Sequence, residues 1–313
     1  MLPRLPRELV LLVLLLALVG GAELVRASAA GGALPFVGML RDVVIRALPT
    51  LLVAIGMALV VGLGGIDLSV GSAMAFTAAV AASAVASGTP FLLAVPLALG
   101  IGAGLGVANG SLVRGLAIQP LVATLVAMVA VRGGAQLVSG GQILEVQDEQ
   151  WLAFGTTAIL ELPIPFWVTL GVFGSVAVLL SATRVGAALA CLGDNPRAAR
   201  LLGLRVSRAV ILTYALSGSL AALAGLIETA SNHAADADKC GLAIELDAIL
   251  AVVIGGTPLR GGRVRLVATV LGVLLVEALA TAMATGNVRR ELALCAKAAL
   301  VLVIAALVGT KAR

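Results

Sequence analysis

Residues 47–64, ALPTLLVAIGMALVVGLG, contain no charged side chain, and they lead into GGIDLSVG at residues 64–71. An uncharged apolar run of about 18 residues is long enough to form a membrane-spanning helix. Asp67 and Ser69 follow this run, among glycines that weaken a helix. A carboxylate this close to membrane depth is costly and is normally paired, solvated or functional. The stretch therefore predicts a transmembrane helix that ends at a polar break, with another helix beginning near Val70.

The remainder of the chain has the same apolar character. Hydrophobic residues make up 61% of its 313 residues and charged residues only 12%, whereas a soluble domain averages about 25% charged residues. This composition excludes a disordered chain and argues against an ordinary soluble domain. We expect an all-α polytopic membrane protein, a single domain over residues 1–313 with about ten spans. The expected spans are 8–26, 47–64, 70–88, 91–113, 118–138, 166–182, 209–229, 246–259, 265–285 and 292–309.

The charges between the apolar runs predict a topology. Loop 183–208 carries five arginines and one aspartate, whereas loop 139–165 carries four acidic residues and no lysine or arginine. The positive-inside rule places the first loop in the cytoplasm and the second outside, which puts both the N- and C-termini in the cytoplasm. Segment 26–46 and the pair at 289–290 do not follow the rule. The length of the first apolar run favours a first helix that is retained in the membrane. The alternative is a signal peptide that is cleaved near Ala27-Ser28-Ala29.

A glycine-rich break recurs in the second half of the chain. Residues 255–262, GGTPLRGG, coincide with residues 64–71 at four of eight positions. Paired glycine-interrupted segments often lie near a transport path, and the match predicts two related halves at 47–138 and 209–309. The apolar run 246–259 is short for a straight span, so we expect it to tilt or to re-enter the membrane. The glycines assigned a structural role are Gly64, Gly65, Gly71, Gly255, Gly256, Gly261 and Gly262.

The sequence carries no signature of a catalytic, nucleotide-binding or metal site. It lacks the Walker A motif, and its one histidine, His233, cannot form a histidine-based metal cluster. Its three cysteines lack disulfide or metal-ligand spacing. Topogenic arginines explain the net charge of +5 better than nucleic-acid binding does. We therefore expect no enzyme activity, no bound cofactor and no nucleic-acid partner, with the energy for any powered transport supplied by another subunit.

Polar residues in or beside the apolar runs are the candidates for a substrate path or gate. Thr124, Arg132 and Gln136 share one helix face, which suits a hydrated path but also suits hydrogen bonds between helices. Asp67 suits a gate, but it also suits the N-cap of the helix that follows. Acidic residues in the first turn of a helix also interact favourably with the helix dipole. The candidates are Asp67, Ser69, Asn109, Gln119, Thr124, Arg132, Gln136, Glu228 and Asp247.

The arginine-flanked loop 183–208 contains a predicted short helix. Asn195 is a good N-cap and Pro196 suits the first helical turn, while Gly203 provides a stop. Such a helix between two spans suits docking into a groove of a partner protein. A solvated loop that only sets topology fits the composition equally well.

Four ordered stretches, together covering roughly residues 45–310, share motifs with one known family. They are GGIDLSVGS at 64–72, IQPLVATL at 118–125, GDNPRAARLLG at 193–203 and IGGTPLRGG at 254–262. These stretches resemble the motifs of permease subunits from ribose-type sugar ABC transporters. Residues 132–143 and 245–254 make the chain most similar to the galactofuranose-type permeases. Pro258 and Arg260 depart from the family pattern, and residues 235–238 keep an outer-loop motif only in part.

The resemblance implies a complex in the bacterial inner membrane. Two permease subunits, identical or sister chains, form the channel, two cytoplasmic ATPase subunits hold ATP and magnesium, and a periplasmic binding protein delivers the sugar. It also implies that segment 193–205 docks the ATPase through Gly193, Asn195, Pro196, Ala198, Ala199 and Gly203. The expected function is ATP-driven import of a galactofuranose-like or ribose-like monosaccharide. The alternative is a self-contained secondary transporter or facilitator for a small polar solute.

Overall fold

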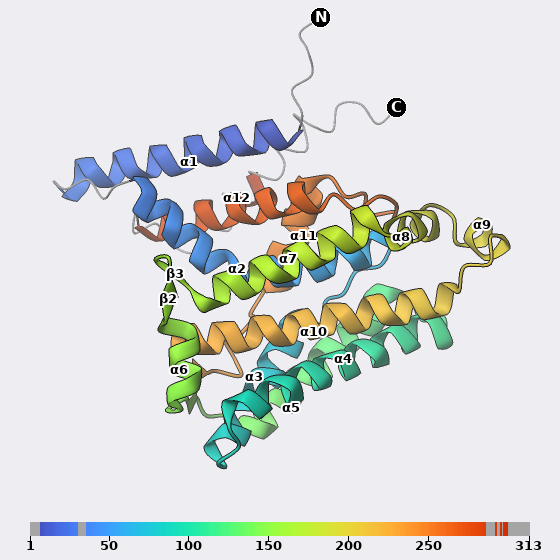
Figure 1. Cartoon of the computed structure of the whole chain (residues 1–313), viewed down its shortest axis with the longest axis horizontal. Helices are drawn as coiled ribbons and strands as arrows, with labels where there is room; N and C mark the ends of the chain where they lie inside the picture. The colour runs from blue at the N-terminus through green and yellow to red at the C-terminus, as the bar shows by residue number, and fades with distance from the viewer. Residues whose placement is uncertain (1–6, 31–35, 286–291, 293–294, 296, 300–313) are drawn as a thin grey trace, which may run out of the picture. The chain divides into compact units, whose positions relative to one another are not determined.

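The computed structural model describes residues 7–30, 36–285, 292, 295 and 297–299, and most of them are helical (Figure 1). The longer helices are α1 (Arg7–Ala30), α2 (Phe36–Gly62), α3 (Val70–Ala86), α4 (Phe91–Gly115), α5 (Pro120–Ser139), α7 (Ile164–Ala182), α10 (Val206–Asn232) and α12 (Leu266–Thr285). The shorter helices are α6 (Glu149–Thr156), α8 (Arg184–Asp194), α9 (Pro196–Leu201) and α11 (Ile244–Gly255). Four two-residue strands form the antiparallel pairs β1 (Leu144–Glu145) with β4 (Ala234–Ala235), and β2 (Ala158–Ile159) with β3 (Leu162–Pro163).

Six helices within the described ranges are long and apolar enough to cross a membrane. They are Gly38–Gly62, Phe91–Gly115, Pro120–Ser139, Ile164–Ala182, Val206–Asn232 and Leu266–Ala284. Five of them contain or nearly match a predicted span, whereas Gly38–Gly62 begins nine residues before the predicted span 47–64. The predicted spans 8–26 and 70–88 coincide with shorter apolar helices, Glu8–Gly20 and Val70–Ala86. Span 292–309 lies largely outside the described residues, so ten crossings and cytoplasmic termini stay predictions.

The two glycine-rich breaks interrupt helices as the sequence indicates. Helix α2 ends at Gly62 and α3 begins at Val70, with the intervening residues in turns or extended backbone. Helix α11 has 12 residues and is therefore about 18 Å long, which is too short to cross a hydrocarbon core of about 30 Å. The predicted run 246–259 thus forms a short helix rather than a full span.

Some local elements differ from the prediction, which was of helices connected by loops. Helix α2 starts at Phe36, inside the segment 26–46 that we expected to be a loop, and the four short strands were not predicted. The predicted loops at 139–165 and 183–208 contain α6 and α8. Both helices are capped locally: Asp148 accepts a hydrogen bond from the N–H of Trp151 at 2.9 Å, and Thr183 accepts one from Val185 at 3.1 Å.

The chain divides into two compact units, and the first comprises residues 1–47, 250–256 and 265–313. In its described part, α1 packs against α12 through a core that includes Leu11, Leu15, Leu275 and Val276. Ten core residues are almost completely buried. Burial of their apolar surface in a close-packed interior holds this unit together.

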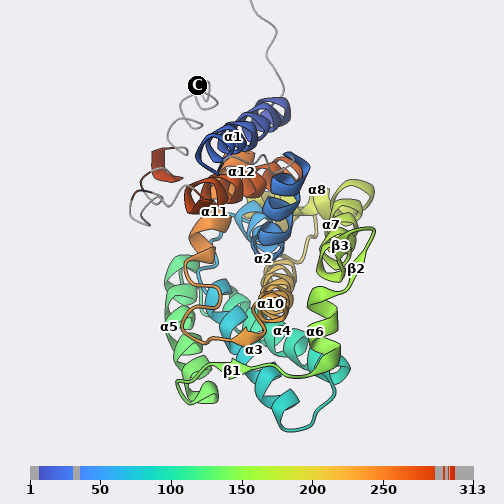
Figure 2. The same ribbon diagram turned by 90° about the vertical axis from the view of Figure 1, so that its left-hand side faces the viewer.

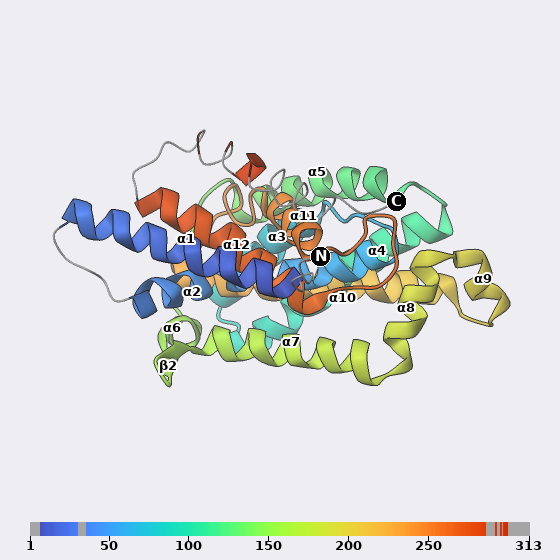
Figure 3. The ribbon, with the colours of Figure 1, turned by 90° about the horizontal axis from the view of Figure 1, so that it is seen from above.

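The second unit comprises residues 48–249 and 257–264 and is organised around α10. Helix α4 runs antiparallel along α10, since Gly102, Gly106 and Gly110 lie against Gly218, Tyr214 and Ile211 in reverse order. Glycines let the two backbones approach closely, as small residues do between membrane helices. Figures 2 and 3 show α5 and α7 on opposite sides of α10.

The α4–α10 contact predicts a sharp difference between two glycines of one helix. A Cβ at Gly106 would collide with the carbonyl oxygen of Tyr214, whereas a Cβ at Gly104 meets nothing within 4 Å. We expect Gly106→Ala to lower the free energy of unfolding by about 2 kcal/mol, because the backbones must separate. Gly104→Ala should leave it unchanged or raise it by up to about 1 kcal/mol, because alanine has the higher helix propensity. Thermal unfolding of the detergent-purified variants, followed by circular dichroism, measures this; equal midpoints would show that the close contact is absent.

Candidate functional site

A cluster of buried polar side chains occupies the break between α2 and α3. Oδ1 of Asp67 accepts hydrogen bonds from the backbone N–H of Ser69 at 3.0 Å and from its hydroxyl at 2.6 Å. The amide of Asn109 on α4 donates to the Ser69 hydroxyl at 2.7 Å. Ser217, near the middle of α10, donates to Oδ2 of Asp67 at 3.5 Å. All four residues are buried, so this cluster is enclosed rather than exposed to a path.

The cluster also shows that the Ser69 side chain does not cap α3. This residue lies at the N-cap position of α3, but its side chain accepts no capping hydrogen bond and donates to Asp67 instead. Thr124 donates to the carbonyl oxygen of Ile66 at 3.3 Å and to that of Pro120 on its own helix at 2.9 Å. Side chains from neighbouring helices therefore satisfy the carbonyl oxygen of Ile66 and the Asp67–Ser69 pair, as a low-dielectric environment requires.

Three glycines from distant parts of the sequence form a backbone junction. The N–H of Gly262 donates to the carbonyl oxygen of Gly62 at 2.8 Å. A Cβ at Gly193, near the end of α8, would collide with that same oxygen and with the nitrogen of Gly262. Gly261 and Gly262 have φ of +94° and +117°, a conformation that favours glycine. We call Gly62, Gly193 and Gly262 the glycine junction; it joins the C-terminal part of α8 to both glycine-rich breaks.

The other glycines assigned a structural role lie at turns or close contacts. Gly64 and Gly256 have φ of +79° and +82°. A Cβ at Gly65 would lie 2.8 Å from the hydroxyl oxygen of Tyr214, and a Cβ at Gly71 would collide with the carbonyl oxygen of Gly241. In the first unit, a Cβ at Gly255 would lie 2.7 Å from the backbone nitrogen of Thr269.

Helix α9 forms as its sequence indicates. Oδ1 of Asn195 accepts hydrogen bonds from the N–H groups of Arg197 at 3.0 Å and Ala198 at 3.1 Å, Pro196 opens the first turn, and Gly203 follows with φ of +81°. Ala199 is completely buried against Leu192 and Val206. Leu201 and Leu202 point the other way, with 91% and 73% of their surface exposed. The helix is thus anchored on one face and presents two leucines on the other.

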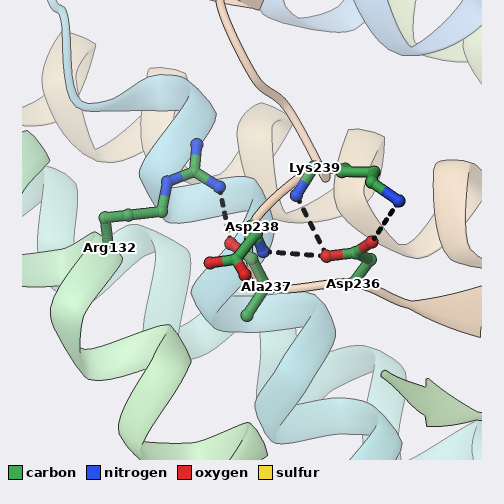
Figure 4. A network of polar contacts seen from close by, with 5 residues as sticks. All are labelled: Arg132, Asp236, Ala237, Asp238 and Lys239. Carbon is green, nitrogen blue, oxygen red and sulfur yellow. Dashed lines mark hydrogen bonds and ion pairs between the residues drawn. The ribbon is translucent and has the colours of Figure 1, made fainter. Parts of the chain in front are cut away.

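Towards the opposite end of α10, the segment 236–241 is clamped by polar side chains (Figure 4). The guanidinium of Arg132 donates to the carbonyl oxygens of Ala237 at 2.9 Å and Cys240 at 2.7 Å. Gln136, one turn further on α5, donates to Asp238 at 2.7 Å. The carboxylate of Glu228 on α10 accepts a hydrogen bond from the N–H of Gly241 at 3.3 Å. Side chains from two helices therefore fix the backbone of this segment.

Charges and burial shift the ionisation of two groups in this segment. Burial opposes ionisation of Asp236, but hydrogen bonds from the backbone N–H groups of Lys239 and Asp238, with the Lys239 ammonium nearby, hold the pKa of this carboxyl below its ordinary value. Burial raises the pKa of the Cys240 thiol well above its usual range, and the Glu228 carboxylate adds to this effect. Asp236 is therefore ionised and Cys240 protonated at neutral pH.

The structure thus sorts the predicted path and gate residues into separate groups. Asp67, Ser69 and Asn109 meet at the α2–α3 break, with Thr124 beside them. Arg132, Gln136 and Glu228 meet around segment 236–241. Gln119 is exposed at the start of α5, and Asp247 lies in the first turn of α11. Within the described ranges, no three His, Cys, Asp or Glu side chains are placed to hold a metal ion.

Sequence reasoning missed partners that lie far away along the chain. Ser217 and Tyr214 flank the α2–α3 break from α10, and the phenol oxygen of Tyr214 is buried with no hydrogen-bond partner in the described structure. Helix α8, which carries Gly193 to the glycine junction, was also missed. The sequence did contain one indication of these contacts, the spacing of small and polar residues along 206–232. This spacing marks a helix face that packs closely, but it does not identify the segment that packs against it.

Comparison with known proteins assigns the family. Residues 39–308 match the family described as branched-chain amino acid transport system, permease component. The chain is 40% identical over 263 residues to the galactofuranose transporter permease protein of Escherichia coli K12, covering 84% of this chain and 77% of the relative. It is 34% identical over 256 residues to the ribose import permease protein of Haemophilus influenzae, covering 80% and 79%. It is 35% identical over 267 residues to the fructose import permease protein of Bifidobacterium longum, covering 83% and 74%.

The chain therefore belongs to this family of transport permeases. The resemblance to ribose-type and galactofuranose-type permeases that the four sequence motifs indicated is confirmed. No solved structure matches the chain.

The close backbone contact at the glycine junction predicts that a side chain placed there will destabilise the surrounding structure. We expect Gly193→Ala to destabilise the protein by about 2 kcal/mol, because the new Cβ pushes the backbones at Gly62 and Gly262 apart. Trypsin should then cut more quickly at the exposed Arg197 and Arg200. Gly174→Ala on α7, where a Cβ meets nothing within 4 Å, is the matched control. Identical tryptic rates and unfolding midpoints for the two variants would contradict the junction.

Proposed function

We propose that this chain is the membrane-spanning permease subunit of an ATP-driven importer for a monosaccharide of the galactofuranose or ribose type. The observation that carries the proposal is the 40% identity to a galactofuranose transporter permease over most of both chains, together with the ribose and fructose import permeases. Six helices able to cross a membrane and an anchored helix with exposed leucines fit such a subunit.

In this proposal α9 faces the cytoplasm and docks onto an ATPase subunit that holds ATP and magnesium. Gly193, Asn195, Pro196, Ala198, Ala199 and Gly203 shape the docking element. Gly193 brings α8 to the backbone of both helix breaks, which gives a route from the docking element to Asp67. Only a difference in contacts between two states can bias such an equilibrium, and the ATPase supplies that difference by holding α9 differently with and without nucleotide.

The proposed path follows α10 from one end to the other. Asp67, Ser69, Asn109 and Thr124 form an enclosed gate beside the middle of α10, and Gln119 lies at the start of α5. Arg132, Gln136, Glu228 and Asp247 face the outer side, where the sugar enters. The arrangement supports this assignment because α9 precedes α10 whereas Glu228 lies near its other end.

The proposed assembly sits in the bacterial inner membrane as a multi-pass protein, with about ten spans and both termini in the cytoplasm. A second permease subunit, identical or a sister chain, completes the channel. A periplasmic sugar-binding protein delivers the cargo to the outer side.

Reconstitution distinguishes this proposal from a self-contained facilitator. Vesicles containing the permease, its ATPase and its binding protein should accumulate labelled sugar only when ATP is present. Vesicles that contain the permease alone should show no sugar flux above empty vesicles. Flux through the permease alone would support the facilitator and overturn the proposal.

Docking of the ATPase depends on the exposed face of α9. We expect Leu201→Asp to weaken copurification of the ATPase by about tenfold or more, because a charge replaces an apolar anchor that is 91% exposed before docking. Leu160→Asp is the matched control, since Leu160 is 81% exposed in the turn between β2 and β3, beyond the other end of α7. The ATPase recovered with each purified variant is quantified; equal loss or equal retention would refute docking through α9.

A further inference from the structure

Two neighbouring cavities lie beside the clamped segment 236–241, near the C-terminal end of α10. The first has a volume of about 230 Å³, and Glu228, Thr229, Asn232 and Asp236 contribute to its lining. The second has a volume of about 260 Å³ and includes Gln142. Ile143, Asp236 and Lys239 line both cavities. The two cavities therefore share part of their lining, and we call them together the α10-end pocket.

The lining of the α10-end pocket combines hydrogen-bond acceptors and donors at short range. Glu228 and Asp236 offer carboxylate oxygens, Asn232 offers both an acceptor and donors, and Lys239 offers only donors. Lys239 and Asp236 form an ion pair at 3.5 Å, but the Lys239 side chain is 80% exposed. An exposed ion pair of this kind is weak, so a ligand hydroxyl can replace either partner at little cost.

Thr229 gives an independent sign of a missing ligand. The residue is only 1% exposed and lines the first cavity, yet its hydroxyl has no hydrogen-bond partner among the residues that the structure describes. Buried hydroxyls are nearly always hydrogen-bonded, so an orphan of this kind requires an explanation. This hydroxyl is closed off from the cavity in the present conformation, so a hydroxyl-bearing ligand would supply the missing partner only after the Thr229 side chain rotates towards it.

The pocket is also held in place before any ligand arrives. Arg132 and Glu228 fix the backbone of segment 236–241 by the hydrogen bonds described above, and β4 pairs with β1 next to the pocket. A wall fixed in advance reduces the conformational entropy that binding would otherwise cost. The pocket thus has the fixed geometry of a binding site rather than that of a loose surface cleft.

We propose that the α10-end pocket is a binding subsite for the transported monosaccharide, with Thr229, Asn232 and Asp236 recognising its hydroxyl groups. Each sugar hydroxyl both donates and accepts hydrogen bonds, which matches this mixed lining. The assignment rests on the proposed sugar-import function and adds specificity-determining residues to it.

Direct binding to the full-length permease tests the subsite without the partner subunits. Tritiated D-ribose, D-galactose and D-fructose are each equilibrated with the permease in lipid nanodiscs. We expect wild type to bind at least one of them, and Thr229→Val and Asp236→Asn to weaken that binding by about tenfold. Ser231→Ala is the matched control, because this side chain donates to Ile227 of its own helix and does not line the pocket. Retained helical circular dichroism and a single gel-filtration peak exclude misfolding.

Several results would overturn the subsite. These are no binding of any of the three sugars to wild type, unchanged affinity in both pocket variants, or binding of labelled L-leucine in place of a sugar. Loss of binding-protein association in the variants, with sugar affinity intact, would make the pocket a protein-docking surface instead. If sugar binding depends on Thr229 but vesicles show no ATP-driven uptake, the subsite stands and the importer proposal fails. If vesicles show ATP-driven uptake but the variants bind sugar as wild type does, the importer proposal stands and the subsite fails.

Discussion

The second unit depends on one constraint: the backbones at Gly62, Gly193 and Gly262 meet so closely that a Cβ at Gly193 would collide with the other two. Side chains at an interface can change rotamer and absorb a small displacement, but backbone in direct contact cannot. A shift of α8 must therefore displace the ends of both glycine-rich breaks together. This is the property that a docking element needs if movement at α9 is to reach the interior, because close-packed interiors transmit strain.

The polar break between α2 and α3 follows from the same constraint. Ending α2 at Gly62 leaves backbone donors and acceptors without helical partners, and because Asp67 and Ser69 are buried, such groups must be satisfied within the protein. Thr124 accordingly donates to the carbonyl oxygen of Ile66, and Asp67 binds the N–H of Ser69. Asn109 and Ser217 then tie this short segment to α4 and α10. The break is a fixed joint between three helices.

The sequence could predict the features that depend on neighbouring residues. Apolar runs indicated the long helices, the glycines near Asp67 indicated the break, and Asn195 with Pro196 indicated α9, because a cap and a first turn are local matters. The same reasoning placed Thr124, Arg132 and Gln136 on one face but could not say what that face contacts. Their partners lie near Ile66 and in segment 236–241, and only the tertiary fold brings these together. The spacing of glycines shows where two backbones can approach closely, but it does not show which segment makes the approach.

Helix α10 connects the three groups to which we assign roles in the proposed transport. Its first residue, Val206, packs on the buried Ala199 of α9, Ser217 near its middle reaches Asp67, and Glu228 and Thr229 near its end line the α10-end pocket. Because α4 lies against it through glycines, α10 cannot bend locally without also moving α4. A displacement at α9 would thus be carried as a rigid-body shift of two helices. Docking element, gate and sugar subsite would then change together, as a gate that opens to one side at a time requires.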